Sequence, residues 1–411
     1  MPRRQTPSTP RQGPRPLPLH CVTQASTLLS STVALPTSKG AWPHWKPHLA
    51  QAAEELAASL AGIDPDLFAE AVAAETRRRF GRFIDGVLAY RGHPWRRGLP
   101  EPPIVWTEGS SRLLDYGGAN DGAPILVVPS LINRAYVLDL TERRSLMRHL
   151  AGRGFRPWLL DWGGPGEAEH AFGLDEYVGG RLLRAMAVMR DSTGRRPVLV
   201  GYCMGGLLAL AAAALAPKAA RALVMLATPW DFHAAQPAQA RLIAGLERDW
   251  RPAIDEAGGL PVDVLQALFA GVDPTSVGRK FRSFLDLDPK SAKARLFVAV
   301  EDWLNDGIPL VAGVANECLF DWYGRNVTAS GAWRVAGQPV RPQAIRQPTL
   351  VMVPTRDRIV PPASALALAR ALPRAHWRRL ATGHIGMVAG SRARTDVYGT
   401  LARWVGRLPP D

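Results

Sequence analysis

Short apolar runs alternate with longer amphipathic segments between residues 101 and 232 of the chain. Runs of about five apolar residues suit strands buried on both faces, and apolar positions spaced by three or four suit helices. This pattern predicts strands at 104–107, 112–116, 125–129, 155–160, 197–200 and 222–227. It predicts helices at 141–153, 175–190 and 207–216. Because strands that alternate with helices form parallel sheets, we expect an α/β fold with a mostly parallel sheet flanked by helices.

The alternation stops at residue 233 and resumes at about residue 346. Residues 233–345 have an irregular or helical pattern and are rich in Trp and Phe. Strands at 349–353 and 376–380 and a helix at 393–407 then follow. Since the interruption falls between strands of one sheet, we interpret 101–232 and 346–411 as two parts of one core. The segment 233–345 is then an inserted cap over the functional end of that sheet.

The chain before the core divides into two segments. Residues 1–45 are rich in Pro, Ser, Thr and Arg and lack a regular period, which predicts a disordered basic leader. Residues 46–100 have apolar positions at helical spacing and predict a helical segment. Within it, Asp64-Pro65-Asp66 is typical of a helix start, and the helical pattern ends near Arg91.

Composition narrows the class of protein. A hydrophobic fraction of 47% in 411 residues supports a large core, and no apolar run reaches the roughly 18 residues that a membrane span requires. No secretory signal peptide is expected, because polar residues follow the first arginines. Cys21, Cys203 and Cys318 are too few and too scattered for a disulfide framework or a zinc site. We therefore expect a reducing, cytoplasmic setting and no bound metal.

The formal net charge of +14 suits a polyanionic partner, such as an anionic surface or a phosphate-bearing substrate. Residues 1–50 contribute six cations and no acid. No nucleic-acid-binding motif accompanies the charge, so we do not expect a nucleic-acid partner. Solvated arginines without a partner are the alternative interpretation.

The stretch Gly201-Tyr202-Cys203-Met204-Gly205-Gly206 lies between a predicted strand and a predicted helix. This pattern is typical of a nucleophile elbow, a sharp turn that places the reactive side chain at its apex. Cys203 stands where such elbows usually have serine. Taken alone, Cys203 could equally be an inert packing residue.

Two further residues follow the last two predicted strands. Asp357 comes after strand 349–353, and His384 comes after strand 376–380. The order Cys203, Asp357, His384 matches nucleophile, acid and base in sheets of this kind. His384 would take the thiol proton, and Asp357 would orient His384 and stabilise its charged form. Alone, Asp357 would be a cap or turn residue and His384 a loop histidine. Three other acids lie in the predicted cap without a preceding strand: Asp302, Asp306 and Asp321.

Two backbone N–H groups are expected to form an oxyanion hole. The elbow supplies that of Met204, and the loop after strand 125–129 supplies one near Leu131. A thiol nucleophile also affects the chemistry, because its attack on a thioester gives another thioester and keeps the acyl group activated. Cys203 therefore favours acyl transfer over hydrolysis, although a thioesterase remains an alternative.

Six stretches within residues 100–400 form one set of motifs. They are Val128-Pro129-Ser130-Leu131-Ile132-Asn133 with Tyr136-Val137-Leu138-Asp139-Leu140; Asp161-Trp162-Gly163; Gly201-Tyr202-Cys203-Met204-Gly205-Gly206; Thr228-Pro229-Trp230-Asp231-Phe232; Asp357-Arg358-Ile359-Val360-Pro361; and Gly383-His384-Ile385-Gly386. Together they resemble the polyhydroxyalkanoate synthases, which polymerise bacterial storage polyesters.

This resemblance implies an α/β-hydrolase core under a cap, with Cys203, His384 and Asp357 as nucleophile, base and acid. It implies polymerisation of (R)-3-hydroxyacyl-CoA with release of CoA, without a further cofactor, at the surface of an intracellular polyester granule. It also implies a homodimer or a partner subunit. The alternatives are a thioesterase or polyester depolymerase of the same fold, and a non-catalytic granule protein. A basic cluster in the cap would either attract CoA phosphates or form a solvated helix face: Arg279, Lys280 and Arg282.

Overall fold

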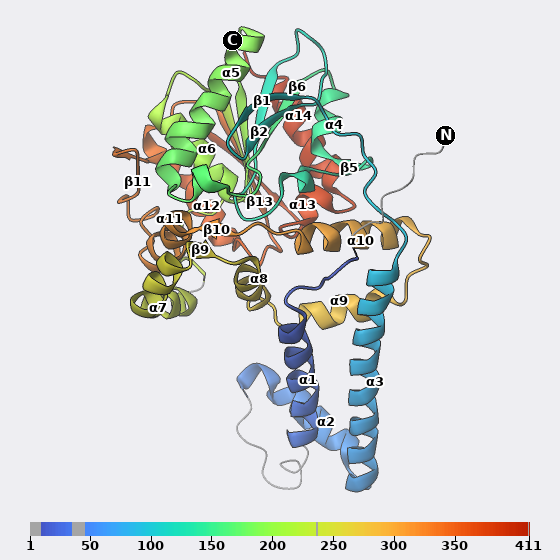
Figure 1. Ribbon diagram of the computed structural model, residues 1–411. Coiled ribbons are helices and arrows are strands. Elements are labelled where there is room, and N and C mark those ends of the chain that lie inside the picture. The colour runs from blue at the N-terminus through green and yellow to red at the C-terminus, as the bar shows by residue number, and fades with distance from the viewer. Residues whose placement is uncertain (1–9, 35–45, 236, 410) are drawn as a thin grey trace. The chain divides into compact units, whose positions relative to one another are not determined.

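The computed structural model describes residues 10–34, 46–235, 237–409 and 411 (Figure 1). The chain forms two compact units. Unit 1 comprises Met1–Trp95 and Gln266–Asn305, and unit 2 comprises Arg96–Leu265 and Asp306–Asp411. The boundaries differ from those expected, because the middle of the predicted cap groups with the N-terminal helices. Among the described helices, none combines the length and the apolar character needed to cross a membrane.

Unit 2 contains an eight-stranded sheet with the order β1-β2-β6-β3-β7-β8-β13-β14. The strands are β1 Ile104–Glu108, β2 Ser111–Asp115, β3 Pro124–Val128, β6 Arg156–Asp161, β7 Val198–Tyr202, β8 Ala222–Leu226, β13 Thr349–Pro354 and β14 Ala375–Leu380. β2 pairs antiparallel with β1 and β6, and all other neighbours are parallel. The predicted mostly parallel sheet is thus confirmed, with each strand within two residues of its predicted limits.

Helices cover both faces of this sheet, with α5 and α6 on one side and α4 and α14 on the other (Figure 1). The helices of the core are α4 Leu146–Ala151, α5 Leu183–Thr193, α6 Met204–Leu215, α12 Pro362–Ala371, α13 Gly386–Ala389 and α14 Gly399–Val405, with π-helices η5 Glu176–Leu182 and η8 Ala393–Tyr398. All residues of β3, β7 and β8 are buried, as expected for central parallel strands.

The predicted helix 141–153 is shorter in the structure. A short antiparallel pair, β4 Asp139–Thr141 and β5 Arg144–Ser145, precedes α4. Ser145 caps α4 by accepting a hydrogen bond from the N–H of Arg148 at 2.9 Å. A serine at this position favours a helix start over helix continuation, and this accounts for the later beginning of the helix.

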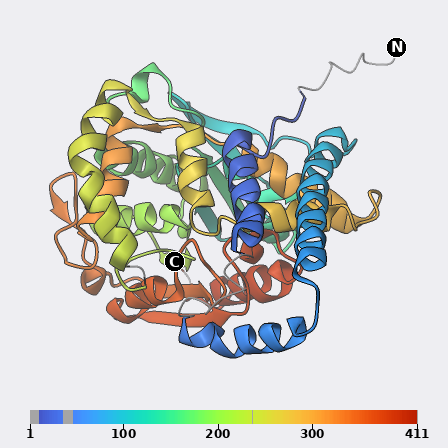
Figure 2. The same ribbon diagram turned by 90° about the horizontal axis from the view of Figure 1, so that it is seen from below.

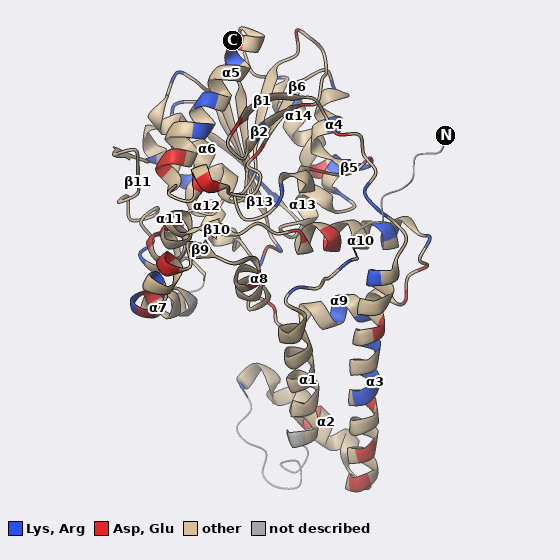
Figure 3. Cartoon of the chain, viewed as in Figure 1, with Lys and Arg blue, Asp and Glu red and all other residues tan. Residues whose placement is uncertain are grey.

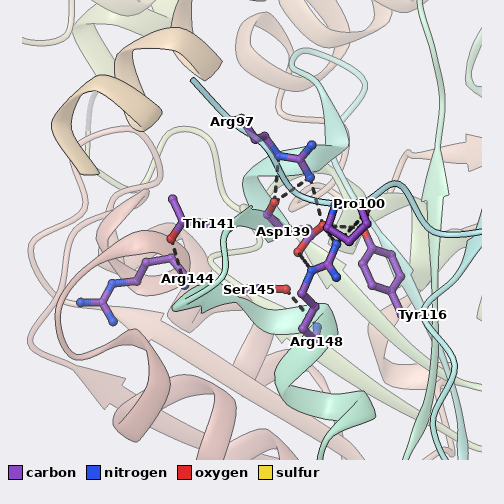
Figure 4. A network of polar contacts seen from close by, with 8 residues as sticks. All are labelled: Arg97, Pro100, Tyr116, Asp139, Thr141, Arg144, Ser145 and Arg148. Atoms are coloured by element: carbon purple, nitrogen blue, oxygen red, sulfur yellow. Dashed lines mark hydrogen bonds and ion pairs between the residues drawn. The ribbon is translucent and has the colours of Figure 1, made fainter. Parts of the chain in front are cut away.

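Asp139 is fully buried and holds three segments of unit 2 together (Figure 4). Its carboxylate accepts hydrogen bonds from Arg148 Nε at 2.8 Å, Arg97 Nη2 at 3.0 Å and the Tyr116 hydroxyl at 3.2 Å. Arg97 precedes the sheet, Tyr116 follows β2, and Arg148 lies in α4. A buried carboxylate needs such partners, because isolated charge is costly to remove from water.

The segment between β8 and β13 is largely helical, as its pattern indicated. Its elements are α7 Pro237–Glu256, β9 Gly259–Leu260, α8 Val262–Ala270, α9 Ser276–Phe284, α10 Ala292–Asn305, β10 Leu310–Val311, α11 Ala312–Asn316, the π-helix η6 Glu317–Gly324, β11 Arg334–Val335, β12 Gln338–Pro339 and η7 Pro342–Ala344. The part within unit 2 meets the loop after β3, where Gly307 bridges to Asn133. The function of this segment as a cap stays a prediction.

Unit 1 consists of helices around one aromatic cluster. Besides α9 and α10 it contains α1 Leu17–Ala34, η2 Pro47–Leu49, α2 Ala50–Leu60 and α3 Pro65–Gly92. α1 lies beside α3 (Figures 1 and 2), and α3 carries interspersed acids and bases along its length (Figure 3). The cluster is buried between these helices: Phe83, Val87, Tyr90, Val277, Phe281, Phe284, Ala294 and Val298. Gly86 permits the close approach, since a Cβ there would lie 2.3 Å from the carbonyl oxygen of Phe281.

The expectation of a disordered leader is wrong for Leu17–Ala34, which forms α1. Leu17 and Cys21, one helical turn apart, pack against the aromatic cluster of unit 1. The tertiary contacts, rather than the weak sequence period, therefore order this segment. Residues 1–9 and 35–45 lie outside the described residues, so the prediction for them stays a prediction.

Candidate active site

Cys203 occupies the turn between β7 and α6, as predicted for an elbow. Its backbone has φ 56° and ψ −126°, a conformation that residues with a side chain rarely adopt. The N–H of Cys203 donates to the carbonyl of Leu226 in β8 at 2.8 Å, which holds the turn on the sheet. The thiol is free and the residue is partly exposed. Local strain of this kind is common where a structure fixes a functional side chain.

The glycines of the motif are required by close backbone approach. A Cβ on Gly201 would lie 2.3 Å from the Cα of Gly206. A Cβ on Gly205 would lie 2.0 Å from the carbonyl oxygen of Val128 in β3. Any larger residue would push α6 away from β7 or from the loop after β3. The Gly-x-Cys-x-Gly spacing therefore follows from how tightly the elbow is packed.

Asp357 and His384 meet at the carboxyl end of the sheet. Asp357 Oδ2 lies 2.6 Å from His384 Nδ1. Its other oxygen, Oδ1, accepts the N–H groups of Ile359 at 2.8 Å and Val360 at 2.9 Å. The carboxylate is buried and held in place by the loop after β13. It therefore holds the imidazole of His384 in one orientation.

His384 interacts with both Asp357 and Cys203, and both affect the pKa of its imidazole. Burial lowers the pKa of His384, but its interactions with Cys203 and Asp357 outweigh burial and raise it to about 10. The Tyr202 hydroxyl donates to the His384 carbonyl at 3.2 Å. The structure thus brings together Cys203, Asp357 and His384, although Cys203 and His384 are 181 positions apart in the sequence. In this arrangement the charged imidazolium form of His384 is favoured.

The alternative acids have other partners. Asp302 pairs with Arg11 at 2.5 Å and accepts the Tyr90 hydroxyl, both within unit 1. Asp306 pairs with Arg134 at 3.3 Å, and Asp321 pairs with Arg325 one helical turn along η6. Among these acids and Asp357, the structure therefore singles out Asp357 as the carboxylate that hydrogen-bonds His384.

The cap cluster is also engaged. Arg279 pairs with Asp273 at 2.9 Å, and Lys280 pairs with Glu301 at 2.7 Å. Arg282 donates to the Gln24 side chain at 3.3 Å. These pairings favour a structural interpretation of the cluster over attraction of a phosphate.

The predicted oxyanion donors lie on elements that meet at the elbow. Met204 is the first residue of α6, where an N–H has no intrahelical acceptor. Leu131 belongs to the loop after β3, whose Pro129 carbonyl accepts the Trp162 indole N–H at 3.0 Å. Since Gly205 packs against Val128 and Pro129, that loop begins beside the elbow. The role of both N–H groups stays a prediction.

Sequence reasoning missed Tyr323 of η6. Burial, followed by interactions with Cys203, Cys318 and Asp357, raises the pKa of Tyr323. Its ring packs on Phe232 with centroids 4.7 Å apart. Cys318 is buried in the same π-helix, where burial raises the pKa of its thiol. A π-helix is often found at functional sites, but no sequence signal distinguishes it from an α-helix.

Comparison with known proteins agrees with this geometry. Residues 123–390 match the family model of the alpha/beta hydrolase fold. The poly(3-hydroxyalkanoate) polymerase subunit PhaC of Allochromatium vinosum is 30% identical over 337 residues, which are 80% of this chain and 94% of that protein. The chain belongs to the PhaC polymerase family. The PhaC subunit of Haloferax mediterranei is 31% identical over 73% of this chain and 63% of its own length.

Membership in the PhaC family agrees with the resemblance found in the motifs. The matched range 123–390 extends from β3 to α13 and contains Cys203, Asp357 and His384. The match to the fold family therefore includes all three candidate catalytic side chains.

Proposed function

We propose that this chain polymerises (R)-3-hydroxyacyl-CoA into a polyester through an acyl-enzyme on Cys203. The observation that carries the proposal is the hydrogen bond between His384 and Asp357 beside the Cys203 elbow, at the carboxyl end of the sheet in a member of the PhaC family. CoA is a substrate group and a product here, and no further cofactor is needed. Cys203 is partly exposed, which supports access of a substrate to this residue.

The first half-reaction transfers the acyl group to the enzyme. The Cys203 thiolate attacks the thioester carbonyl, and the oxygen becomes an oxyanion that the N–H groups of Met204 and Leu131 stabilise. The bond to the CoA sulfur then breaks, and CoA leaves as a thiol with the proton from His384. One thioester is replaced by another, so this step is nearly neutral in free energy.

The second half-reaction forms the ester. The 3-hydroxyl of another acyl unit attacks the Cys203 thioester while His384 accepts the hydroxyl proton. Asp357 stabilises the resulting imidazolium through its bond to Nδ1. The Cys203 thiolate leaves, and the chain has grown by one hydroxyacyl unit. Because esters lie below thioesters in free energy, growth proceeds without ATP.

We propose that this chain acts at the surface of an intracellular polyester granule. Several relatives are named as subunits, which supports a second copy or a partner subunit for this chain. A thioesterase or depolymerase would use the same three side chains, with water in place of the hydroxyl.

The decisive experiment incubates the purified chain with 3-hydroxybutyryl-CoA and follows three products. We expect CoA release, insoluble polyester, and an acyl adduct on Cys203 by mass spectrometry. Cys203→Ala should give none of these, whereas the matched variant Cys21→Ser, in unit 1, should retain them all. CoA release with free 3-hydroxy acid alone would establish the hydrolase instead, and no adduct at all would establish a non-catalytic protein.

A further inference from the structure

Unit 2 contains a hollow of about 830 Å³ beside the last strand of the sheet. It lies between the first halves of β13 and β14 and the C-terminal helix α14. Four arginines and two tryptophans are among the residues that line it: Arg374, Trp377, Arg378, Arg403, Trp404 and Arg407. His384 follows the opposite, carboxyl end of β14. Among the described residues, none that lines this hollow belongs to the elbow or to the loops that carry Asp357 and His384, so the hollow is separate from the candidate active site.

The charge around the hollow is strongly one-sided. Residues 341–411 contain twelve arginines and three aspartates, which accounts for +9 of the +14 on the whole chain. No carboxylate lines the hollow within the described residues. Arg374 donates to the backbone carbonyl of Arg346, and Arg403 donates to the Thr400 hydroxyl. Elsewhere in unit 2, Arg97, Arg148 and Arg181 all pair with carboxylates.

Protection of a sheet edge explains only part of this pattern. β14 is the last strand of the sheet, and cations on an edge strand discourage pairing with another molecule. Arg378 on β14 could have that function. Arg403 and Arg407 lie on or just after α14 and line the same hollow, which edge protection does not require. Cations converging from separate elements on one concavity are typical of an anion site.

Two indoles add a second chemical feature. Trp377 is 46% exposed, although a large aromatic side chain is usually more buried, and the Arg379 guanidinium lies over its ring at 5.8 Å from the centroid. Trp404 lines the same hollow. Indoles stack with planar rings, and arginine forks match phosphate oxygens. The volume is within the range of roughly 300–1,000 Å³ that small-molecule sites occupy. A nucleotide combines both features, a planar base and a cluster of phosphates.

We propose that this hollow binds a free nucleotide, with its phosphates on Arg378 and Arg407 and its base against the face of Trp377 opposite Arg379. The two arginines come from different elements, so the phosphates would bridge β14 and the end of α14. The assignment does not depend on the reaction proposed for Cys203, because the hollow lies at the other end of the sheet. CoA and ATP carry the same recognised groups and are the two sources to distinguish.

The test is calorimetric titration of the full chain carrying Cys203→Ala with ATP, CoA, inorganic tripolyphosphate and a thymidine decanucleotide. We expect ATP to bind, and Arg378→Gln/Arg407→Gln to weaken it at least tenfold. Trp377→Ala should weaken ATP at least threefold without changing tripolyphosphate binding. The matched double variant Arg334→Gln/Arg370→Gln removes the same charge outside the hollow and should change ATP affinity less than twofold.

Each other outcome is informative. If CoA displaces ATP from the hollow with similar or higher affinity, the site serves the acyl-CoA pool; if it does not, the site serves another nucleotide, and both results support the assignment. Absence of ATP binding would overturn it, and so would an equal loss in the control variant. If tripolyphosphate binds as tightly as ATP, the base contributes nothing to affinity, and the hollow attracts phosphates by charge alone; this would overturn the proposal. A decanucleotide binding a hundredfold more tightly than ATP would replace the nucleotide with a single-stranded nucleic acid.

Discussion

Units 1 and 2 place their apolar side chains differently. The central strands of unit 2 are buried along their whole length, and its candidate chemistry lies directly at the ends of those strands. In unit 1, α2 has no buried residue, and among the described residues eight of the twelve exposed large apolar side chains belong to this unit. Unit 2 thus resembles a rigid scaffold for a site, whereas unit 1 depends on one aromatic cluster. The comparison can be tested by substitutions that should affect one unit and spare the other.

The largest effect is expected at the site of unit 2. Asp357→Asn keeps the size of the side chain but removes the charge that orients His384 and helps to raise its pKa. We expect CoA release from 3-hydroxybutyryl-CoA to fall by about 10²–10⁴-fold, as for the equivalent change in serine hydrolases. Asp306→Asn, at an alternative acid that pairs with Arg134, should change the rate less than threefold. A reversed result would move the acid from Asp357 to Asp306.

The next effect is expected in the cluster of unit 1. Phe281 is fully buried, with ring centroids 5.7 Å from Tyr90 and 5.5 Å from Phe297. Phe281→Ala should lower the local stability by about 3–5 kcal/mol, because it leaves a cavity between α3 and α9. Hydrogen exchange should accelerate in α3 and α9 but not in β7.

Leu88→Ala is the matched control for that change. Leu88 lies on α3 and is 59% exposed, so its removal should change stability by less than about 0.5 kcal/mol. If Phe281→Ala accelerates hydrogen exchange in β7 to the same extent as in α3, the two units unfold together. They would then differ in composition but not in stability.

A third effect probes the buried charge of unit 2. Asp139→Ala leaves Arg97, Arg148 and the Tyr116 hydroxyl without their shared acceptor. We expect the free energy of unfolding to fall by about 2–4 kcal/mol. This loss is smaller than the loss from breaking a fully buried ion pair, because both arginines are partly exposed to solvent. Urea unfolding measures it. Asp191→Ala breaks the exposed pair with Arg190 and should cost at most about 0.5 kcal/mol, and an equal loss in both variants would contradict the assigned role of burial.

The same contrast explains what the sequence could predict. Strands β3, β7 and β8 are short apolar runs whose local pattern matches their final burial, and Asp357 and His384 follow strands, so their convergence follows from parallel topology. α1 was missed because its order depends on contacts of Leu17 and Cys21 with residues more than 60 positions away. Tyr323 was missed for the same reason, since its place near Cys203 depends on how η6 packs.

The smallest effect compares one type of interaction in both units. Asp64 caps α3 from an exposed position by accepting the N–H groups of Asp66 at 2.8 Å and Leu67 at 3.4 Å. Ser145 caps α4 from a buried position by accepting the N–H of Arg148. We expect Asp64→Ala to cost about 0.5–1 kcal/mol and Ser145→Ala about 1.5–2 kcal/mol, because water can replace the lost acceptor only at Asp64.

Thermal or urea unfolding measures both cap variants, with Asp64→Ser and Ser145→Thr as conservative controls that retain an oxygen acceptor. Each control should recover most of the stability lost in the corresponding alanine variant. The ratio between the two alanine variants is the informative quantity, since both remove one cap and differ chiefly in solvent access. Equal losses would mean that burial does not strengthen local interactions in unit 2, and the contrast between the units would then rest on its apolar core alone.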